Sequence, residues 1–294
     1  MKAAAEPPND TSIREALAWA VRCFSSLITD TPRLDAELLL AHTLNWNRTR
    51  LHTYPERVLS QQERLDFKAL TRRHALGEPL AYILGSREFF GLDFLVDKEV
   101  LIPRPETELL VEKARAWIQT RASETGGLAA ADIGTGSGAI AISLALECPR
   151  LTIYATDISP GALQIAARNA DRHGVAGRVQ MLHGNLLEPL PKAVHLIVAN
   201  LPYVSEAEMA QLPPHIANFE PRLALEGGPD GLALIERLLA QASAHLRPQG
   251  LILLEIGAAQ GQAAQNCGRR HFPQAQIQIV QDHGLRDRLL VIQT

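Results

Sequence analysis

The spacing of apolar residues in the first quarter of the chain is helical. Between about residues 12 and 76, apolar positions recur at steps of three and four, as at Leu34, Leu38 and Leu39, with acidic residues between them. Pro32 stands where a helix would begin, since proline fits the first turn. The pattern predicts four or five short helices in a small bundle. Because the bundle carries no chemical motif, it is either a stabilising cap or a module that recognises a large substrate.

A break and a hairpin pattern follow the bundle. Gly77-Glu78-Pro79 interrupts the helical spacing, and residues 89–96 alternate around a glycine as the two strands of a hairpin do. The run at 100–108 closes this linker. Pro105 then fits the first turn of a helix that extends to about Gln119.

From residue 128 onward, strands alternate with helices. We expect strands at 128–133, 151–156, 179–182, 194–199 and 251–255, and a final pair at 277–280 and 288–292 around Gly284. Helical patterns occupy 138–147 and 232–246. The predicted fold is α/β: a Rossmann-like seven-stranded sheet, mostly parallel with an antiparallel last strand, after a helical bundle and a β-hairpin linker. We expect a helical domain at 1–84 and the hairpin with the sheet domain at 85–294.

Composition limits the class of protein. Of 294 residues, 46% are hydrophobic and 21% charged, which is typical of a soluble globular protein. The net charge of -3 gives no overall basic field, so we expect no stable nucleic-acid binding, although a local patch remains possible. The scattered cysteines Cys23, Cys148 and Cys267 indicate a reducing compartment and no metal site. With no signal peptide and no apolar run of membrane-spanning length, we expect a cytoplasmic protein without a membrane partner.

A glycine-rich turn follows the first expected strand. It comprises Asp132, Ile133, Gly134, Thr135, Gly136, Ser137 and Gly138. Glycine there lets the backbone approach a ligand, and Asp157 ends the next strand, where its carboxylate can accept from two ribose hydroxyls. The spacing Gly134-x-Gly136-x-x-Ala139 also satisfies the dinucleotide fingerprint, so NAD is the alternative. The terminal antiparallel hairpin, in place of a second mononucleotide-binding half, favours S-adenosylmethionine.

Two neighbouring positions have open interpretations. Asp132 either is a polar strand end or contacts the ammonium group of the methionine part of the donor. Asn185 and Leu186 follow the third expected strand, where a polar side chain can read the adenine amino group. The alternative there is a simple turn.

A second segment, at the end of the fourth expected strand, suits a planar amide or amine nitrogen. Asn200, Leu201, Pro202 and Tyr203 follow an apolar run at 196–199. The Asn200 side-chain oxygen and the Leu201 carbonyl can each accept one N–H of an NH2 group, and Tyr203 can stack on its plane. Alone the tetrapeptide would be a turn, but ligands of open α/β sheets bind at the carboxyl ends of strands. We expect Asn200 and Tyr203 to be catalytic, all four residues to bind substrate, and Asn200 also to contact the donor.

These residues together resemble the class I S-adenosylmethionine-dependent methyltransferases and, more narrowly, the release factor glutamine methyltransferase family. The run at 102–108, Ile-Pro-Arg-Pro-Glu-Thr-Glu, is the most specific part of the resemblance. Similar segments lie at 34–40, 77–85, 134–138, 200–203, 219–221 and 286–288. The resemblance implies methyl transfer from S-adenosyl-L-methionine to the N5 amide nitrogen of the glutamine in the Gly-Gly-Gln loop of class I peptide chain release factors.

By the same resemblance, residues 134–138, Asp157 and Leu186 bind the donor, and residues 200–203 bind the glutamine. Two positions depart from the usual family pattern. Leu201 replaces a proline and still supplies a backbone carbonyl. Asn185 replaces an aspartate and keeps one acceptor without the charge.

Three other functions stay open at this point. The same acceptor geometry serves a glutamine methyltransferase of a ribosomal protein and an adenine or guanine amino methyltransferase, although the modest charge weighs against nucleic acid. A third alternative, from a different class, is a non-catalytic donor-binding or ribosome-associated module.

Overall fold

The computed structural model describes residues 10–24, 29–121 and 127–294. Parts of the expected helical domain, at 1–9 and 25–28, therefore lie outside the described residues. The chain forms two compact units: Met1–Gly85 with Pro213–Phe219, and Ser86–Leu212 with Glu220–Thr294. The hydrophobic pattern does not predict that 213–219 belongs with the first unit. None of the described helices is long and apolar enough to cross a membrane.

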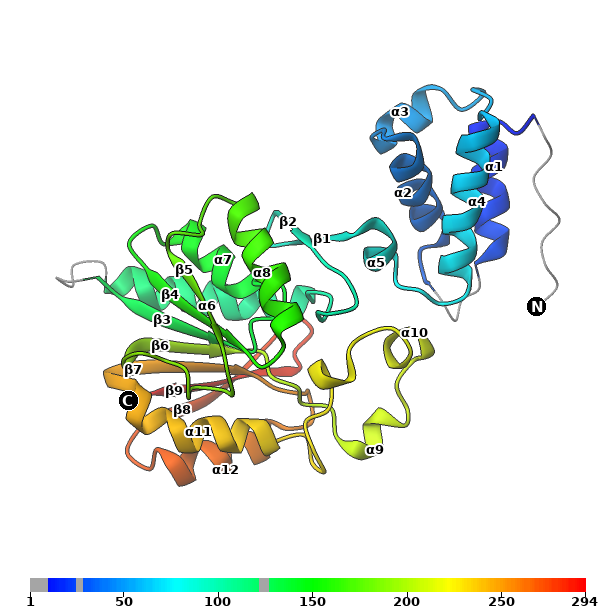
Figure 1. The fold of residues 1–294 in the computed structure, drawn as a ribbon. Coiled ribbons are helices and arrows are strands. Elements are labelled where there is room, and N and C mark those ends of the chain that lie inside the picture. The colour runs from blue at the N-terminus through cyan, green and yellow to red at the C-terminus, as the bar shows by residue number, and fades with distance from the viewer. Residues whose placement is uncertain (1–9, 25–28, 122–126) are drawn as a thin grey trace. The chain divides into compact units, whose positions relative to one another are not determined.

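The first unit is helical, as predicted. Its elements are α1 (Ile13–Cys23), α2 (Pro32–Leu44), α3 (Arg48–Thr53), α4 (Gln61–Ala75) and α5 (Leu80–Leu84), with the short α10 (Pro214–Ala217) from the later segment (Figure 1). Both α1 and α4 begin with a capping box, in which a serine and the glutamate three residues on satisfy each other's backbone N–H. Trp19 of α1 packs edge-to-face on Phe67 of α4, with 6.1 Å between ring centroids. The two helices therefore share one apolar core.

The second unit opens with the predicted hairpin. Strand β1 (Ser86–Phe89) pairs antiparallel with β2 (Leu92–Leu95). The two turn residues, Phe90 and Gly91, have φ of 54° and 73°, as in the tight turns that match strand twist. The strand begins at Ser86, whereas the predicted start was residue 89. The prediction missed its first three residues because they are polar and show no apolar alternation. The 3₁₀ turn η1 (Pro105–Thr107) and helix α6 (Glu108–Thr120) then form the predicted helix.

A seven-stranded sheet forms the body of the second unit and confirms the predicted fold. Its strands are β3 (Ala129–Ile133), β4 (Thr152–Asp157), β5 (Val179–His183), β6 (Val194–Ala199), β7 (Leu246–Glu255), β8 (Gln276–Gln281) and β9 (Asp287–Gln293). Their order is β5-β4-β3-β6-β7-β9-β8, with β3 to β7 parallel and β9 antiparallel to both of its neighbours. Strand β7 begins before residue 251, where the prediction placed its start. The apolar pattern did not indicate the first part of the strand, because that part is mostly exposed and polar and is irregularly paired.

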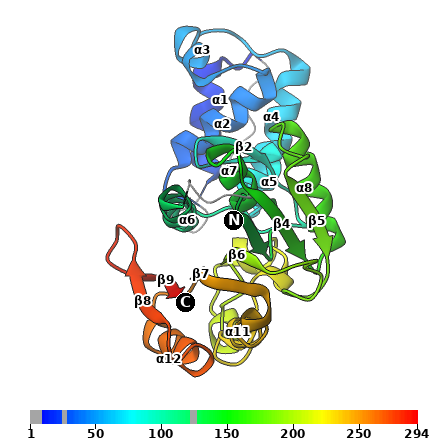
Figure 2. The same cartoon turned by 90° about the vertical axis from the view of Figure 1, so that its left-hand side faces the viewer.

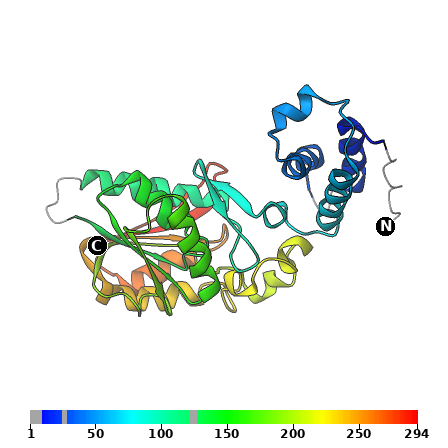
Figure 3. The same ribbon diagram turned by 45° about the horizontal axis from the view of Figure 1, so that its top comes forward.

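Helices cover both faces of this sheet. On one face lie α6, α7 (Ala139–Glu147) and α8 (Pro160–Arg172); on the other lie α11 (Ala233–His245) and α12 (Gly261–His271) (Figures 1 and 3). Strand β5 lies at one edge and β8 at the other (Figure 2). Side chains of β6 alternate between the two cores: Leu196 and Val198 face the first, Ile197 and Ala199 the second. Short elements α9 (Glu206–Met209) and η2 (Arg222–Ala224) lie in the connection after β6.

One buried amide ties the hairpin to the glycine-rich turn. The Asn169 side chain, on α8, is fully buried. Its Oδ1 accepts from the Leu95 N–H at 2.8 Å, and its Nδ2 donates to the carbonyls of Leu95 at 3.0 Å and Ser137 at 2.8 Å. The Asn169 side chain therefore links α8 to the end of the hairpin and to the glycine-rich turn.

Replacing this amide should destabilise the second unit. We expect Asn169→Ala to lower the free energy of unfolding by about 3 kcal/mol, because the backbone groups of the half-buried Leu95 and the buried Ser137 lose their partners. Urea denaturation measures the change. The control is Gln262→Ala on α12, whose amide donates to Asn266 at the exposed surface. A loss no larger for Asn169→Ala than for this control would contradict the assigned role.

Candidate active site

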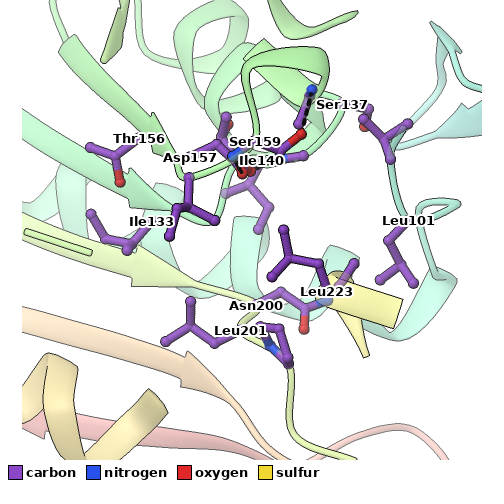
Figure 4. A pocket seen from close by; sticks show the side chains of 18 of the residues that line it. Leu101, Ile133, Ser137, Ile140, Thr156, Asp157, Ser159, Asn200, Leu201 and Leu223 are labelled. Carbon is purple, nitrogen blue, oxygen red and sulfur yellow. Dashed lines mark hydrogen bonds between the residues drawn. The ribbon is translucent and has the colours of Figure 1, made fainter. Parts of the chain in front are cut away.

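The second unit contains a cavity of about 400 Å³ at the carboxyl ends of the parallel strands. Its walls include the turn after β3, the end of β4, the loop after β5 and the segment after β6. Asp157 and Ser159 lie on one side of the cavity, and Asn200 and Leu201 lie on the other (Figure 4). Both segments that the sequence singles out thus meet in one place, at the sheet edge where open α/β folds bind ligands.

The glycine-rich turn is held mainly by its own backbone. The N–H groups of Gly134 and Thr135 both donate to the Thr156 carbonyl at 2.9 Å, and the Gly138 N–H donates to the Thr135 carbonyl at 2.8 Å. Gly134, Thr135, Gly136 and Ser137 line the cavity, whereas Gly138 does not. Gly138 has φ of 81°, and a Cβ there would lie 2.9 Å from Ile142 Cδ1. Its role is therefore to start α7 and to keep the helix packing close.

Asp157 ends β4 with its carboxylate at the cavity. Oδ2 accepts from the Gly136 N–H at 2.9 Å, and Oδ1 accepts from the Ser159 N–H at 2.9 Å. Burial raises the pKa of this carboxyl, against the opposing effect of these hydrogen bonds. Each oxygen keeps a lone pair for a further donor. The arrangement suits a ligand that offers a pair of hydroxyl groups.

Asp132 lies beneath the turn and does not line the cavity. Its Oδ2 accepts from Thr135 Oγ1 at 2.7 Å and from the Ala141 N–H at 3.1 Å, so it joins the turn to α7. Its Oδ1 is buried and has no hydrogen-bond partner among the described residues. Burial raises the pKa of Asp132 to about 7. The observed contacts support the turn, and a contact with an ammonium group stays a prediction.

The loop after β5 brings Asn185 and Leu186 to the cavity. Both ends of the Asn185 amide are engaged: Nδ2 donates to Glu188 at 2.7 Å, and Oδ1 accepts from Arg237 at 3.1 Å. Leu186 has φ of 51°, and its carbonyl accepts from Thr156 Oγ1 at 3.0 Å. The loop is therefore shaped by protein contacts, and a readout of adenine by Asn185 stays a prediction.

The segment after β6 divides between the cavity and the protein interior. Asn200, Leu201 and Pro202 line the cavity, but Tyr203 is not among the lining residues. Leu201 is buried, and its Cδ2 would lie 3.1 Å from a Cβ on Gly134, so its side chain packs against the glycine-rich turn. The Tyr203 hydroxyl donates to Glu255 Oε1 at 3.3 Å, and burial raises the pKa of Tyr203. The predicted stacking surface is thus anchored at its polar end.

Two residues that sequence reasoning did not select complete this region. Asn200 Nδ2 donates to Thr107 Oγ1 at 3.0 Å, and that hydroxyl donates to Glu255 Oε2 at 2.6 Å. The sequence contains a sign of each residue: Thr107 stands in the motif at 102–108, and Glu255 is a carboxylate at the end of an apolar strand. Only the fold shows that they touch.

Comparison with known proteins finds relatives along nearly the whole chain. The chain matches the families described as "PrmC N-terminal domain" over residues 15–85 and "Methyltransferase small domain" over residues 107–215. It is 44% identical over 278 residues to the release factor glutamine methyltransferase of Moorella thermoacetica, covering 94% of this chain and 96% of that protein. For the protein of the same name from Rhodopirellula baltica, identity is 37% over 298 residues, with 98% and 99% covered. A solved methyltransferase from Pyrococcus furiosus covers 70% of this chain and 90% of its own at 19% identity and a TM-score of 0.48.

Identity of this extent over nearly the whole length of both proteins leaves one assignment: the chain belongs to the release factor glutamine methyltransferase family.

Proposed function

We propose that the protein transfers a methyl group from S-adenosyl-L-methionine to the N5 amide nitrogen of the glutamine in the Gly-Gly-Gln loop of class I peptide chain release factors. The observation that carries this proposal is that the Asp157 carboxylate and the Asn200 segment line opposite sides of the same cavity. Membership of the family agrees with it. The site of action would be the cytoplasm, where release factors work.

The residues at one end of the cavity fit the methyl donor. Gly136 has φ of 56° and open space where a Cβ would stand, so a ligand can approach its backbone. The Asp157 oxygens suit the two ribose hydroxyls, and Leu186 with Ile133 gives an apolar surface for a base. When bound, the donor supplies a methyl group on a positively charged sulfur, which is intrinsically reactive toward a nitrogen lone pair.

The residues at the other end of the cavity position the acceptor. A glutamine amide nitrogen is a weak nucleophile because its lone pair is delocalised into the carbonyl. Asn200 Oδ1 and the Leu201 carbonyl would each accept one of its N–H groups and so turn the lone pair toward the donor. The Leu201 side chain, packed on Gly134, keeps this carbonyl close to the turn that borders the donor. The nitrogen–methyl bond would form as the methyl–sulfur bond breaks and S-adenosylhomocysteine leaves. The methylated amide is then positively charged and strongly acidic, and it would lose its extra proton to water. These residues therefore contribute orientation rather than a dedicated base.

The first unit would recognise the release factor. It contains a hydrophobic core of its own and matches a family described as an N-terminal domain. The cavity lies wholly in the second unit, since none of its lining residues belongs to the first. Recognition of a large protein by a separate unit would add binding energy remote from the reacting atoms.

Direct methylation tests the proposed function. Incubated with the donor and purified release factor, the protein should add one methyl group to the peptide that contains Gly-Gly-Gln, as mapped by mass spectrometry. A release factor in which that glutamine is replaced by asparagine should remain unmodified. Methylation of ribosomal protein or of nucleobases, with the release factor untouched, would contradict the proposal.

Single substitutions at the two ends of the site should affect donor binding and methyl transfer differently. Asp157→Ala removes a charged acceptor, so we expect donor affinity to fall by roughly 10-fold to 100-fold in calorimetry. Tyr203→Ala should leave donor affinity within about threefold of the wild type, yet lower single-turnover methylation by roughly tenfold or more, because the acceptor end loses its support. Equal losses of donor affinity in the two variants would show that the ends are not separate.

A further inference from the structure

A chain of buried hydrogen bonds runs behind the cavity wall. Glu255, at the end of β7, is 1% exposed, and Thr107, at the end of η1, is 4% exposed. The Glu255 carboxylate accepts from Thr107 Oγ1 at 2.6 Å and from the Tyr203 hydroxyl at 3.3 Å. Thr107 Oγ1 in turn accepts from Asn200 Nδ2 at 3.0 Å. Thr107 lines the cavity, whereas Glu255 does not.

The carboxylate determines the direction of every hydrogen bond in this chain. An ionised carboxylate has no proton to donate, so the hydroxyl of Thr107 must donate to it. A hydroxyl has only one proton, and Thr107 Oγ1 can therefore offer only a lone pair to its other neighbour. Asn200 must meet that lone pair with its NH2 group. Its Oδ1 is then left for the cavity, which Asn200 lines.

We propose that Glu255, acting through Thr107, is a positioning residue that sets the orientation of the Asn200 amide so that Oδ1, and not Nδ2, is presented to the substrate nitrogen. This inference rests on the proposed function, which makes the substrate group an N–H donor. A reversed Asn200 would present its own N–H groups to that donor and could not orient its lone pair. The second branch, from Tyr203 to the same carboxylate, holds the segment after β6 at its other end.

The surroundings of Glu255 make the hydrogen-bond chain from Glu255 through Thr107 to Asn200 dependent on pH. Burial raises the pKa of Glu255 to about 7, while the Thr107 hydrogen bond, the charge of Arg288 on β9 and the Tyr203 hydrogen bond lower it and Glu106 of η1 raises it further. Below that pKa the carboxyl carries a proton and can donate to Thr107 Oγ1. The Thr107 hydroxyl is then free to donate to Asn200 Oδ1, which favours the reversed amide. Activity should therefore be present above the pKa and fall as the pH drops through about 7.

Kinetics of full-length variants test the inference. Thr107→Val removes the hydroxyl at nearly constant shape and should lower single-turnover methylation of the release factor by roughly tenfold or more, with donor affinity within about twofold of the wild type. Thr107→Ser keeps the hydroxyl and should restore most of the rate. The matched control is Thr120→Val at the other end of α6, where the hydroxyl donates to the Trp117 carbonyl at the exposed surface; its rate should equal that of the wild type. Donor affinity also reports that each variant is folded.

A pH series with Glu255→Gln separates positioning from simple structural support. This variant has no ionisable group at position 255, so its activity should be low and should fall less below about pH 7 than that of the wild type. Asp132, whose pKa is also about 7, is present in both proteins and contributes equally to both profiles. Equal rates for Thr107→Ser and Thr107→Val, or a wild-type profile in Glu255→Gln, would overturn the inference.

A measurement without substrate keeps this test independent of the proposed function. The side-chain NH2 signals of Asn200 in the nitrogen-15 spectrum, assigned by their absence in Asn200→Asp, should shift with an apparent pKa of about 7 in the wild type. They should not shift over that range in Glu255→Gln. If the wild type fails to methylate release factor while these signals titrate as described, the proposed function fails and the positioning role stands. If the Asn200 NH2 signals show the same pH dependence in the wild type and in Glu255→Gln, the positioning role is overturned, whatever the methylation activity.

Discussion

The buried carboxylate of Glu255 is the constraint on which the acceptor side of the site depends. Removing an ionised group from water costs several kcal/mol unless hydrogen bonds and opposite charge offset the loss. Here the offsetting groups are the hydroxyls of Thr107 and Tyr203 and the nearby charge of Arg288. Each of these partners comes from a different segment, so the need to satisfy one carboxylate draws those segments together.

The topology of the sheet makes this convergence possible. Strands β3, β6 and β7 are neighbours and parallel, so their carboxyl ends lie on the same side of the sheet. The glycine-rich turn, the Asn200 segment and Glu255 therefore lie close together. Strand β9 runs antiparallel beside β7, with Leu289 opposite Glu255, and so brings Arg288 to that edge from its own amino end. Strand β9 therefore supplies a charge near Glu255 as well as side chains of the core.

Much of the fold follows from local pattern, and much of the site does not. Buried strands, the hairpin around Gly91 and the helix that starts near Pro105 each have a signal within a few residues, and all are present. Where the pattern is weak, as in the exposed first part of β7, the predicted boundary was wrong. Thr107 and Glu255 are separated by 148 positions, and no periodicity links them. For Gly138 and Asp132 the motif predicts ligand contact, which stays a prediction, and packing contacts that the motif does not indicate support the turn.

In the proposed reaction, Asn200 presents an acceptor to an amide nitrogen beside the donor. A crystal structure with S-adenosylhomocysteine and a peptide that contains Gly-Gly-Gln tests it most directly. We expect the glutamine side-chain nitrogen to lie within hydrogen-bonding distance of both Asn200 Oδ1 and the Leu201 carbonyl, with Asn200 Nδ2 still donating to Thr107 Oγ1. A glutamine bound away from this pair of oxygens, or held through its carbonyl by Asn200 Nδ2, would show that Asn200 does not orient the substrate nitrogen.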